Sequence, residues 1–293
     1  MFTPSRNPRA GLYIKQSAAP ARSPNEQNFI VMTTLSPDLV QFLIRGGATA
    51  LIVACVLLSV DRFGPAVGGY LTGVPIVIGP GIAFIAMDQD ALVVSEVSRS
   101  ALAALYGTQI FLVAFAWGAL RELSPPAILA LALALWLVAI GVMVPLHLPV
   151  TLLMGGFALL TFATRFWMRR FRAAHDLHRQ LSVREALIRG LFGGLIVASA
   201  GLTGHLLPAE IGGIIVAVPI ALIMITTSVQ AKYGVGMLVS LAHAALLGVC
   251  GLAIFAFVVA QTIQHTPAVV SLTLALFACL AFTAAIAAFS PKS

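Results

Sequence analysis

A block of this chain recurs once, 144 residues downstream, without a gap. Fourteen of the 34 residues in 43–76 are identical to their counterparts in 187–220, and the run Leu43–Gly46 returns as Leu187–Gly190. An ungapped repeat constrains the fold because both copies are expected to adopt similar backbones. In an apolar chain, a repeat on this scale is typical of transporters whose substrate site lies where the repeats meet.

The composition indicates whether this repeat folds in water or in a membrane. Hydrophobic residues make up 60% of the 293 residues, charged residues make up only 9%, and the mean hydropathy is +1.01. A water-soluble domain could not cover such a surface with polar groups, so we expect an all-α polytopic membrane protein. Cys55, Cys250 and Cys279 lie in apolar runs without partner spacing, which indicates neither a disulfide framework nor a metal site.

Nine stretches reach the length of about 20 mostly apolar residues that a membrane-spanning helix needs. They cover residues 40–60, 65–87, 93–119, 125–146, 149–167, 185–204, 208–229, 235–261 and 268–289. The first four correspond to the last four at the same offset, so the predicted plan is two four-helix repeats joined by one linker helix. Proline pairs and single prolines fall at the span boundaries, where a missing N–H costs least.

This plan divides the chain into four parts. They are a polar N-terminal tail at 1–38, a first repeat at 39–147, a linker helix with a basic loop at 148–183, and a second repeat at 184–293. We expect the tail to be disordered, or to be upstream sequence if translation begins at Met32. It has no apolar core and therefore does not resemble a secretory signal.

The single linker helix predicts that the second repeat is inverted, because four spans return the chain to its starting side and the fifth carries it across. The distribution of basic residues supports this count and places the C-terminus in the cytoplasm. One side would hold Arg62, Arg121, Arg165, Arg169, Arg170, Arg172, Arg179, Arg184, Arg189, Lys232 and Lys292. If residues 149–167 do not cross the membrane, the repeats are parallel instead. The net charge of +7 therefore indicates topology and not a nucleic-acid partner, since no nucleic-acid motif accompanies it.

Equivalent prolines interrupt the second and seventh spans. Pro75 and Pro219 occupy matching positions in the repeat, and Gly73 lies just before the first of them. A proline inside a helix leaves a carbonyl without its partner, and such a break at membrane depth is tolerated where it is packed or lines a cavity. We therefore predict that the two breaks contribute to a substrate site, with helix packing and a simple kink as the alternative. Packing is the favoured role for Gly68, Gly69, Gly212 and Gly213.

Charged residues near the membrane supply further candidates for substrate binding. Arg45 and Arg189 are equivalent in the repeat, and an arginine can bind a carboxylate or phosphate through two hydrogen bonds. Both lie close to a membrane face, so reaching toward lipid headgroups is an equal alternative.

Glu96 and Arg99 have the i,i+3 spacing of neighbours on one helix face, and the repeat counterpart of Arg99 is His243. A carboxylate or a histidine near the membrane could carry a coupling proton. An interfacial ion pair without any role in transport is the simpler interpretation of Glu96 and Arg99.

Motifs for other chemistry are weak in this sequence. His175 and His178 have a spacing that could hold a metal on a helix, but without further ligands a solvated basic loop beside anionic lipid is the better interpretation. There is no phosphate-binding glycine loop, no GxSxG elbow, no HExxH and no paired-carboxylate motif. We therefore expect no cofactor, no resident metal and no enzymatic activity.

The segment Gly64–Pro75 follows the pattern GP-x-x-GG-x-L-x-G-x-P. It resembles small four-helix bacterial membrane proteins of about 110 residues, whose function is largely uncharacterised. The second half keeps Gly212, Gly213 and Pro219 of that pattern, with Pro208 one position out of register. The resemblance implies a tandem copy in a bacterial inner membrane. The plan is also similar to that of fused small transporters, in which a linker helix sets two copies in opposite orientations.

These patterns favour a secondary transporter that binds a small molecule between inverted repeats. An anionic or neutral polar substrate is favoured over a cationic one, because arginines occupy equivalent positions and buried acids are scarce. The expected partners are the lipid bilayer, the substrate, a coupling ion and a second copy in a homo-oligomer. The alternative is a membrane scaffold or assembly factor that does not transport, with the basic loop at 165–184 contacting lipid or another protein.

Overall fold

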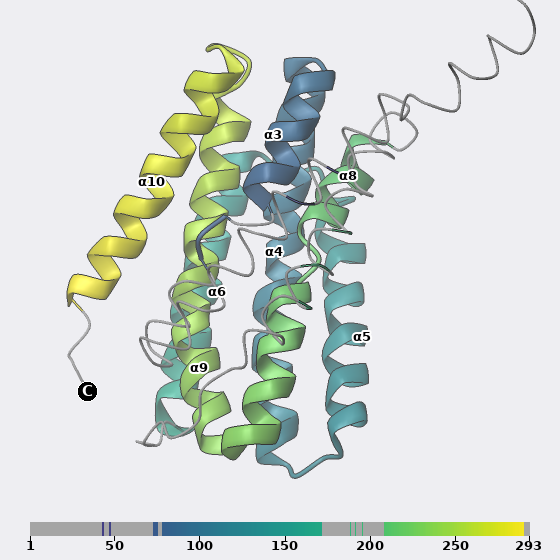
Figure 1. The fold of residues 1–293 in the computed structure, drawn as a ribbon, viewed down its shortest axis with the longest axis vertical. Coiled ribbons are helices and arrows are strands. Elements are labelled where there is room, and N and C mark those ends of the chain that lie inside the picture. Colours follow the sequence, from purple (N-terminus) through teal and green to yellow (C-terminus); the bar gives the residue numbers. More distant parts are fainter. Residues whose placement is uncertain are drawn as a thin grey trace, which may run out of the picture. The chain divides into compact units, whose positions relative to one another are not determined.

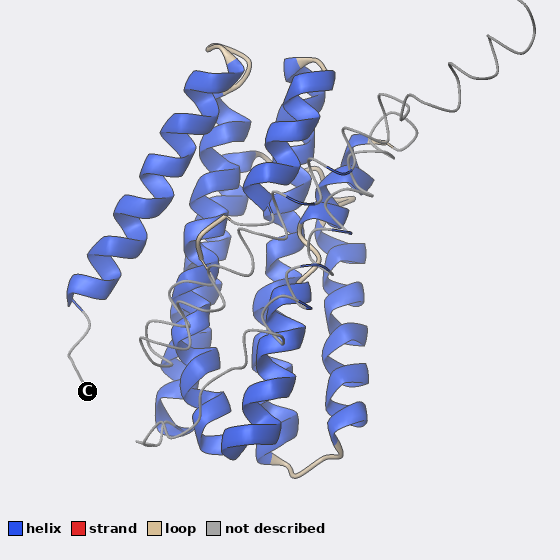
Figure 2. Ribbon diagram, in the orientation of Figure 1, coloured by secondary structure: helices blue, strands red, loops and turns tan. Residues whose placement is uncertain are grey.

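The computed structural model describes residues 73–75, 78–171 and 208–289, together with the single positions 43, 47, 188, 191 and 195. All described residues belong to one compact unit, Gln41–Ser293. Within these residues every regular element is a helix (Figure 2).

The helices keep the labels of Figure 1. They are α3 (Ile78–Asp88), α4 (Ala91–Leu120), α5 (Pro125–Met143), α6 (Val150–Met168) with the 3₁₀ turn η1 (Arg169–Phe171), α8 (Ala209–Val216), α9 (Ile220–Thr262) and α10 (Ala268–Phe289). Prolines mark most of the starts. Pro125 opens α5, while Pro149, Pro208 and Pro219 are the N-caps of α6, α8 and α9. The fixed φ of proline and its missing N–H suit these positions.

Five described helices are long and apolar enough to cross a membrane: Ala91–Leu120, Pro125–Met143, Val150–Phe171, Gly234–Thr262 and Ala268–Ile286. They coincide with five of the predicted spans, so the expectation of an all-helical membrane protein is confirmed for the described residues. The predicted spans at 40–60 and 185–204 lie outside them, apart from single positions. Two further spans, at 65–87 and 208–229, are interrupted where they are described.

The helix α9 consists of two segments that meet at Gly234. This glycine has φ 80° and ψ −175°, in the region that L side chains rarely adopt. The second segment, from Gly234 to Thr262, is the one that is long and apolar enough to cross a membrane.

Hydrogen bonds between side chains and backbone fix the relative directions of three helices. Ser95 Oγ, near the start of α4, donates to the carbonyl of Ala260, near the end of α9, at 2.8 Å. The two helices are therefore antiparallel. The hydroxyl of Tyr106 donates to Leu153 O at 2.6 Å, and Gln109 Nε2 donates to Thr161 Oγ1 further along both helices. This order shows that α6 runs parallel to α4.

The core lies between α4 and α9. In the most apolar stretch of α4, 78% of the residues are buried, and in that of α9 72% are buried, against 28% for α5 and 17% for both α6 and α10. Alanines such as Ala101, Ala104, Ala245 and Ala253 are almost fully buried there. Small residues allow the helix backbones to approach closely, which is how membrane helices gain packing contacts without a hydrophobic driving force. The exposed faces of α5, α6 and α10 carry large apolar side chains, as expected of helices that face lipid.

Candidate functional site

The first candidate feature is a pair of interruptions in the helical backbone. Gly73–Pro75 forms a turn, and the N–H of Gly79 then donates to Pro75 O at 2.9 Å as α3 begins. The second turn, Ala217–Pro219, lies 144 residues later and separates α8 from α9. The N–H of Ile223 donates to Pro219 O at 2.8 Å. Gly73, Pro75 and Pro219 are all buried. Each predicted proline site therefore lies at a turn followed directly by a helix N-terminus.

The elements next to the two turns touch each other. A Cβ placed on Gly81 of α3 would lie 2.7 Å from Cγ1 of Val216, the last residue of α8. A Cβ on Gly212 would reach Ile85, further along α3, at 4.0 Å. The helix that follows the first turn thus packs antiparallel against the helix that precedes the second.

Gly73 anchors the first turn to two other helices. A Cβ at this position would lie 2.6 Å from the carbonyl carbon of Gly248 in α9, so only glycine fits there without a backbone shift. Cys279 Sγ of α10 donates to Gly73 O at 3.2 Å. The first turn is therefore held by α9 and α10.

Gly213 allows a similarly close backbone contact between α8 and α4. A Cβ on Gly213 would lie 2.7 Å from the backbone nitrogen of Ala101 in α4 and nearer still to Val97 O and Ser100 Oγ. Gly212, its neighbour, is in ordinary contact with Val97 at 3.5 Å. These contacts are helix packing. Gly68 and Gly69 lie outside the described residues.

The second candidate feature is the ion pair between Glu96 and Arg99. Arg99 Nε donates to Glu96 Oε1 at 2.9 Å and to Oε2 at 2.8 Å, and its Nη2 also donates to Oε1. Arg99 is only 7% exposed, and its Nη1 is buried without a hydrogen-bond partner among the described residues. A buried guanidinium with one unpaired nitrogen can donate a hydrogen bond to a further anionic or carbonyl oxygen.

His147 and Glu210 complete a polar cluster around this ion pair. The ligand atoms of Glu96, His147 and Glu210 all lie within 4.8 Å of one another, although they come from α4, the α5–α6 loop and α8. His147 has φ 45°, and its Nδ1 lies 2.7 Å from Pro145 O. Because a carbonyl can only accept, Nδ1 carries the proton, and Nε2 faces Glu210 Oε1 at 3.8 Å.

This cluster can exchange protons or hold a cation. Two carboxylates and an imidazole are ligands that a divalent metal accepts. However, the guanidinium of Arg99 already binds both oxygens of Glu96, which opposes a second cation at that carboxylate. His147 Nε2 and Glu210 Oε1 are 3.8 Å apart and both side chains are exposed, so a protonated His147 would form only a loose surface ion pair with Glu210. Neither residue could be predicted from the sequence, because the packing of α8 against α4 brings Glu210 to Glu96 and the α5–α6 loop brings His147.

The remaining predicted residues do not join this cluster. His243 is 3% exposed, and its backbone carbonyl accepts a hydrogen bond from Arg165 Nη1 of α6. About 25 Å of helix separates it from Ala260, which lies beside the start of α4. His243 and Arg99 therefore lie toward opposite ends of the core helices. Arg45 and Arg189, as well as His175 and His178, lie outside the described residues.

A buried polar contact joins three helices away from both features. Gln109 Nε2 of α4 donates to Thr161 Oγ1 of α6, and the same hydroxyl lies 3.2 Å from Cys250 Sγ of α9. All three residues are buried, and Gln109 Oε1 has no partner within the part of the chain that the structure describes. A glutamine inside an apolar span is an available sequence signal, since polar residues are costly there and are often functional.

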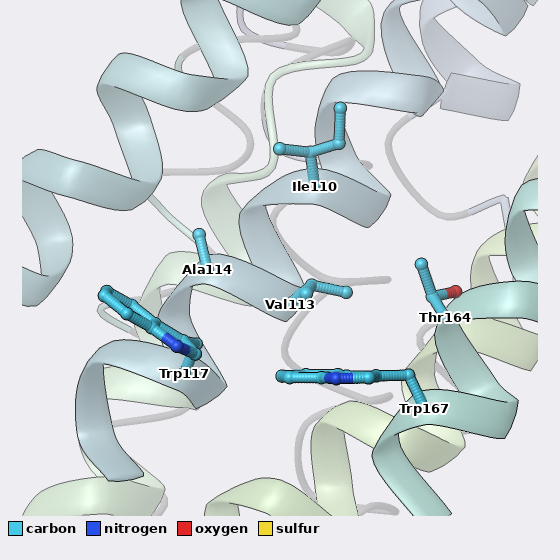
Figure 3. A pocket seen from close by; sticks show the side chains of 6 residues that line it. All are labelled: Ile110, Val113, Ala114, Trp117, Thr164 and Trp167. Atoms are coloured by element: carbon cyan, nitrogen blue, oxygen red, sulfur yellow. The ribbon is translucent and has the colours of Figure 1, made fainter. Parts of the chain in front are cut away.

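An apolar groove opens between α4 and α6 near the ends of both helices (Figure 3). Its volume is about 290 Å³. It is lined by Ile110, Val113, Ala114, Trp117, Thr164 and Trp167. The sequence analysis did not identify it, because its walls come from two spans that are not consecutive.

Comparison with protein-family models, with curated proteins and with solved structures found no match. The resemblance of Gly64–Pro75 to small four-helix bacterial membrane proteins therefore stays a prediction. The function of this chain has to be inferred from the contacts described above.

Proposed function

We propose that the protein is a secondary transporter of a small molecule, built from two inverted four-helix repeats and a linker helix, with about nine membrane spans. The observation that carries this proposal is the pair of turns at Gly73–Pro75 and Ala217–Pro219. They occupy the same register of the repeat, and α3 and α8 connect them by direct contact. Broken helices at matching positions of two repeats are the usual sign of a substrate site in such transporters.

Further boundaries support a repeat. Asp90, the N-cap of α4, corresponds in register to Gly234, where the two segments of α9 meet. Thus α3 and α4 match the two segments of α9, and α5 matches α10. The direction of the helices supports inversion, because α4 and the second segment of α9 are antiparallel. The helix α6 supplies the additional crossing that inversion needs.

The charges at the two ends of α4 and α6 support an orientation. Arg121 follows the end of α4, and Arg165, Arg169 and Arg170 lie at the end of α6; we call this the arginine end. The opposite end carries Asp88, Asp90, Glu96 and Glu210, and we call it the acidic end. By the positive-inside bias the arginine end faces the cytoplasm. Since α10 runs away from the acidic end, the C-terminus is cytoplasmic in this proposal.

The two turns define the proposed substrate site. Both α3 and the first segment of α9 begin there, and a helix N-terminus favours negative charge because its first N–H groups lack partners within the helix. This favours an anionic or neutral polar substrate. The cluster of Glu96, His147 and Glu210 at the acidic end supplies groups that could carry a coupling proton.

Transport would require one repeat to move against the other. The α8–α4 contact at Gly213 lies between the proposed repeats, because α8 belongs to the second and α4 to the first. Small residues at this interface let the two helix backbones approach closely. We propose that this interface shifts as the site opens alternately to the two sides.

The test is uptake into proteoliposomes, with solid-supported membrane currents recorded for a panel of organic anions, amino acids and sugars. Pro219→Ala and Pro75→Ala remove the two breaks, and Pro208→Ala is the matched control, because Pro208 is an exposed N-cap outside both turns. We expect wild-type flux of at least one solute, unchanged flux in Pro208→Ala and at least tenfold lower flux in the other two. Unchanged flux in Pro75→Ala and Pro219→Ala would remove the site assignment. No flux of any solute by folded protein would favour the scaffold alternative.

A further inference from the structure

The groove between α4 and α6 is lined by apolar side chains and is suited to bind a hydrocarbon chain. Figure 3 shows Val113 facing the ring of Trp167 across the groove, with Ile110, Ala114 and Trp117 on the same helix as Val113. Thr164 is the one hydroxyl-bearing residue in the lining. Its Oγ1 already donates within α6, to Leu160 O at 2.8 Å, so it has no need of a polar ligand. The groove therefore suits an acyl chain and not a polar solute.

Three arginines lie next to lining residues at one end of this groove, one in contact with Trp117 and two beside Trp167 in the chain. The guanidinium carbon of Arg121 lies 5.4 Å from the centre of the Trp117 ring. On the other wall, Trp167 packs against Phe171 with ring centres 5.1 Å apart, and Arg169 and Arg170 lie between these two residues in the chain. All three arginines are exposed, and Glu122 is the neighbouring carboxylate beside Arg121. The net charge of these four residues at the rim of the groove is therefore positive.

We propose that the groove binds one anionic phospholipid from the leaflet at the arginine end. The acyl chain lies along Val113 between the two tryptophans, and the phosphate contacts Arg121. Tryptophans near the ends of spanning helices occupy the headgroup level of a bilayer, and guanidinium groups bind phosphate through paired hydrogen bonds. Charge complementarity at the rim selects an anionic lipid over a zwitterionic one. This site is independent of the proposed transport activity.

The native tryptophans report on the site directly. The chain has three, and Trp136 is 5% exposed, packs against Gly107 and is not one of the residues that line the groove. The full-length protein is reconstituted into vesicles of phosphatidylcholine that contain a few per cent of a lipid brominated on one acyl chain, either phosphatidylglycerol or phosphatidylcholine. Bromine quenches indole fluorescence on contact. We expect brominated phosphatidylglycerol to quench at a several-fold lower fraction of the lipid than brominated phosphatidylcholine.

Four variants locate the effect. Arg121→Gln should lower the preference for the anionic lipid about fivefold, which is the typical contribution of one arginine near a membrane surface. Val113→Phe should fill the groove and reduce quenching by both lipids, whereas Val138→Phe, at a residue of α5 that is 62% exposed, should not. A double variant, Trp117→Phe with Trp167→Phe, leaves only Trp136 and should show no lipid preference.

Three results would overturn the proposal. One is equal quenching of the wild-type protein by the two brominated lipids, since charge would then select nothing. The second is a wild-type level of quenching in folded Val113→Phe, which would mean that the lipid lies elsewhere. If neither lipid quenches Trp117 or Trp167, a second copy of the chain or another segment covers the groove, and the proposal is wrong.

Discussion

The contact of Gly213 with α4 allows a stability effect to be calculated. Gly213→Ala adds one methyl group, which would lie 2.7 Å from Ala101 N and nearer still to Val97 O. Both are backbone atoms, so the helices must separate, and overpacking of this kind costs up to about 3 kcal/mol. The higher helix propensity of alanine returns about 1 kcal/mol. We expect a net loss of about 2 kcal/mol in the free energy of unfolding.

Gly141 of α5 is the matched control, because a Cβ there would meet no atom within 4 Å. Gly141→Ala keeps the propensity gain of about 1 kcal/mol without a clash. The two variants should therefore differ by about 3 kcal/mol in reversible unfolding by sodium dodecyl sulfate in mixed micelles. Ser100→Ala in the Gly213→Ala background should recover only part of the loss, since the backbone contacts stay. Equal stability of the two glycine variants would refute the close approach of α8 to α4.

Two further predictions concern buried polar contacts. Thr161→Val removes the acceptor of the Gln109 amide and should cost about 1 kcal/mol in the same unfolding assay, whereas Thr164→Val, which loses only bonds within its own helix, should cost less; the reverse order would contradict the Gln109 contact. Glu96→Gln leaves the buried guanidinium of Arg99 without its counter-ion and should cost about 2 kcal/mol. Adding Arg99→Met should recover most of that loss, and a double variant less stable than Glu96→Gln alone would show that Arg99 does not depend on Glu96.

The spans that the sequence predicts well are those bounded by strong local signals. The apolar stretches behind Pro125, Pro149 and Pro267 become α5, α6 and α10, because a proline fixes the start and an apolar run of sufficient length fixes the rest. The pairing of Glu96 with Arg99 could also be predicted from the sequence, since residues with i,i+3 spacing are neighbours on any helix.

Contacts between segments that are distant in the chain could not be predicted from the sequence. His147 lies beside Glu210 because the α5–α6 loop and the start of α8 meet in space, and the backbone at His147 has a positive φ. Neither fact follows from hydropathy, which gives the length of a span and says nothing about its neighbours. The same holds for the groove between Trp117 and Trp167 and for the hydrogen bond from Gln109 to Thr161.

The central claim is that the two turns border a site open alternately to both sides of the membrane. Val74 and Val218 are equivalent in the repeat, each precedes one of the two prolines, and both are half-buried. The direct measurement is the labelling of single cysteines at these positions, in a background without native cysteines, by a membrane-impermeant maleimide applied to right-side-out and to inverted vesicles. Alternating access predicts that both positions are labelled from both sides. Labelling from neither side would show that the turns are packed, and labelling from one side only would contradict alternating access.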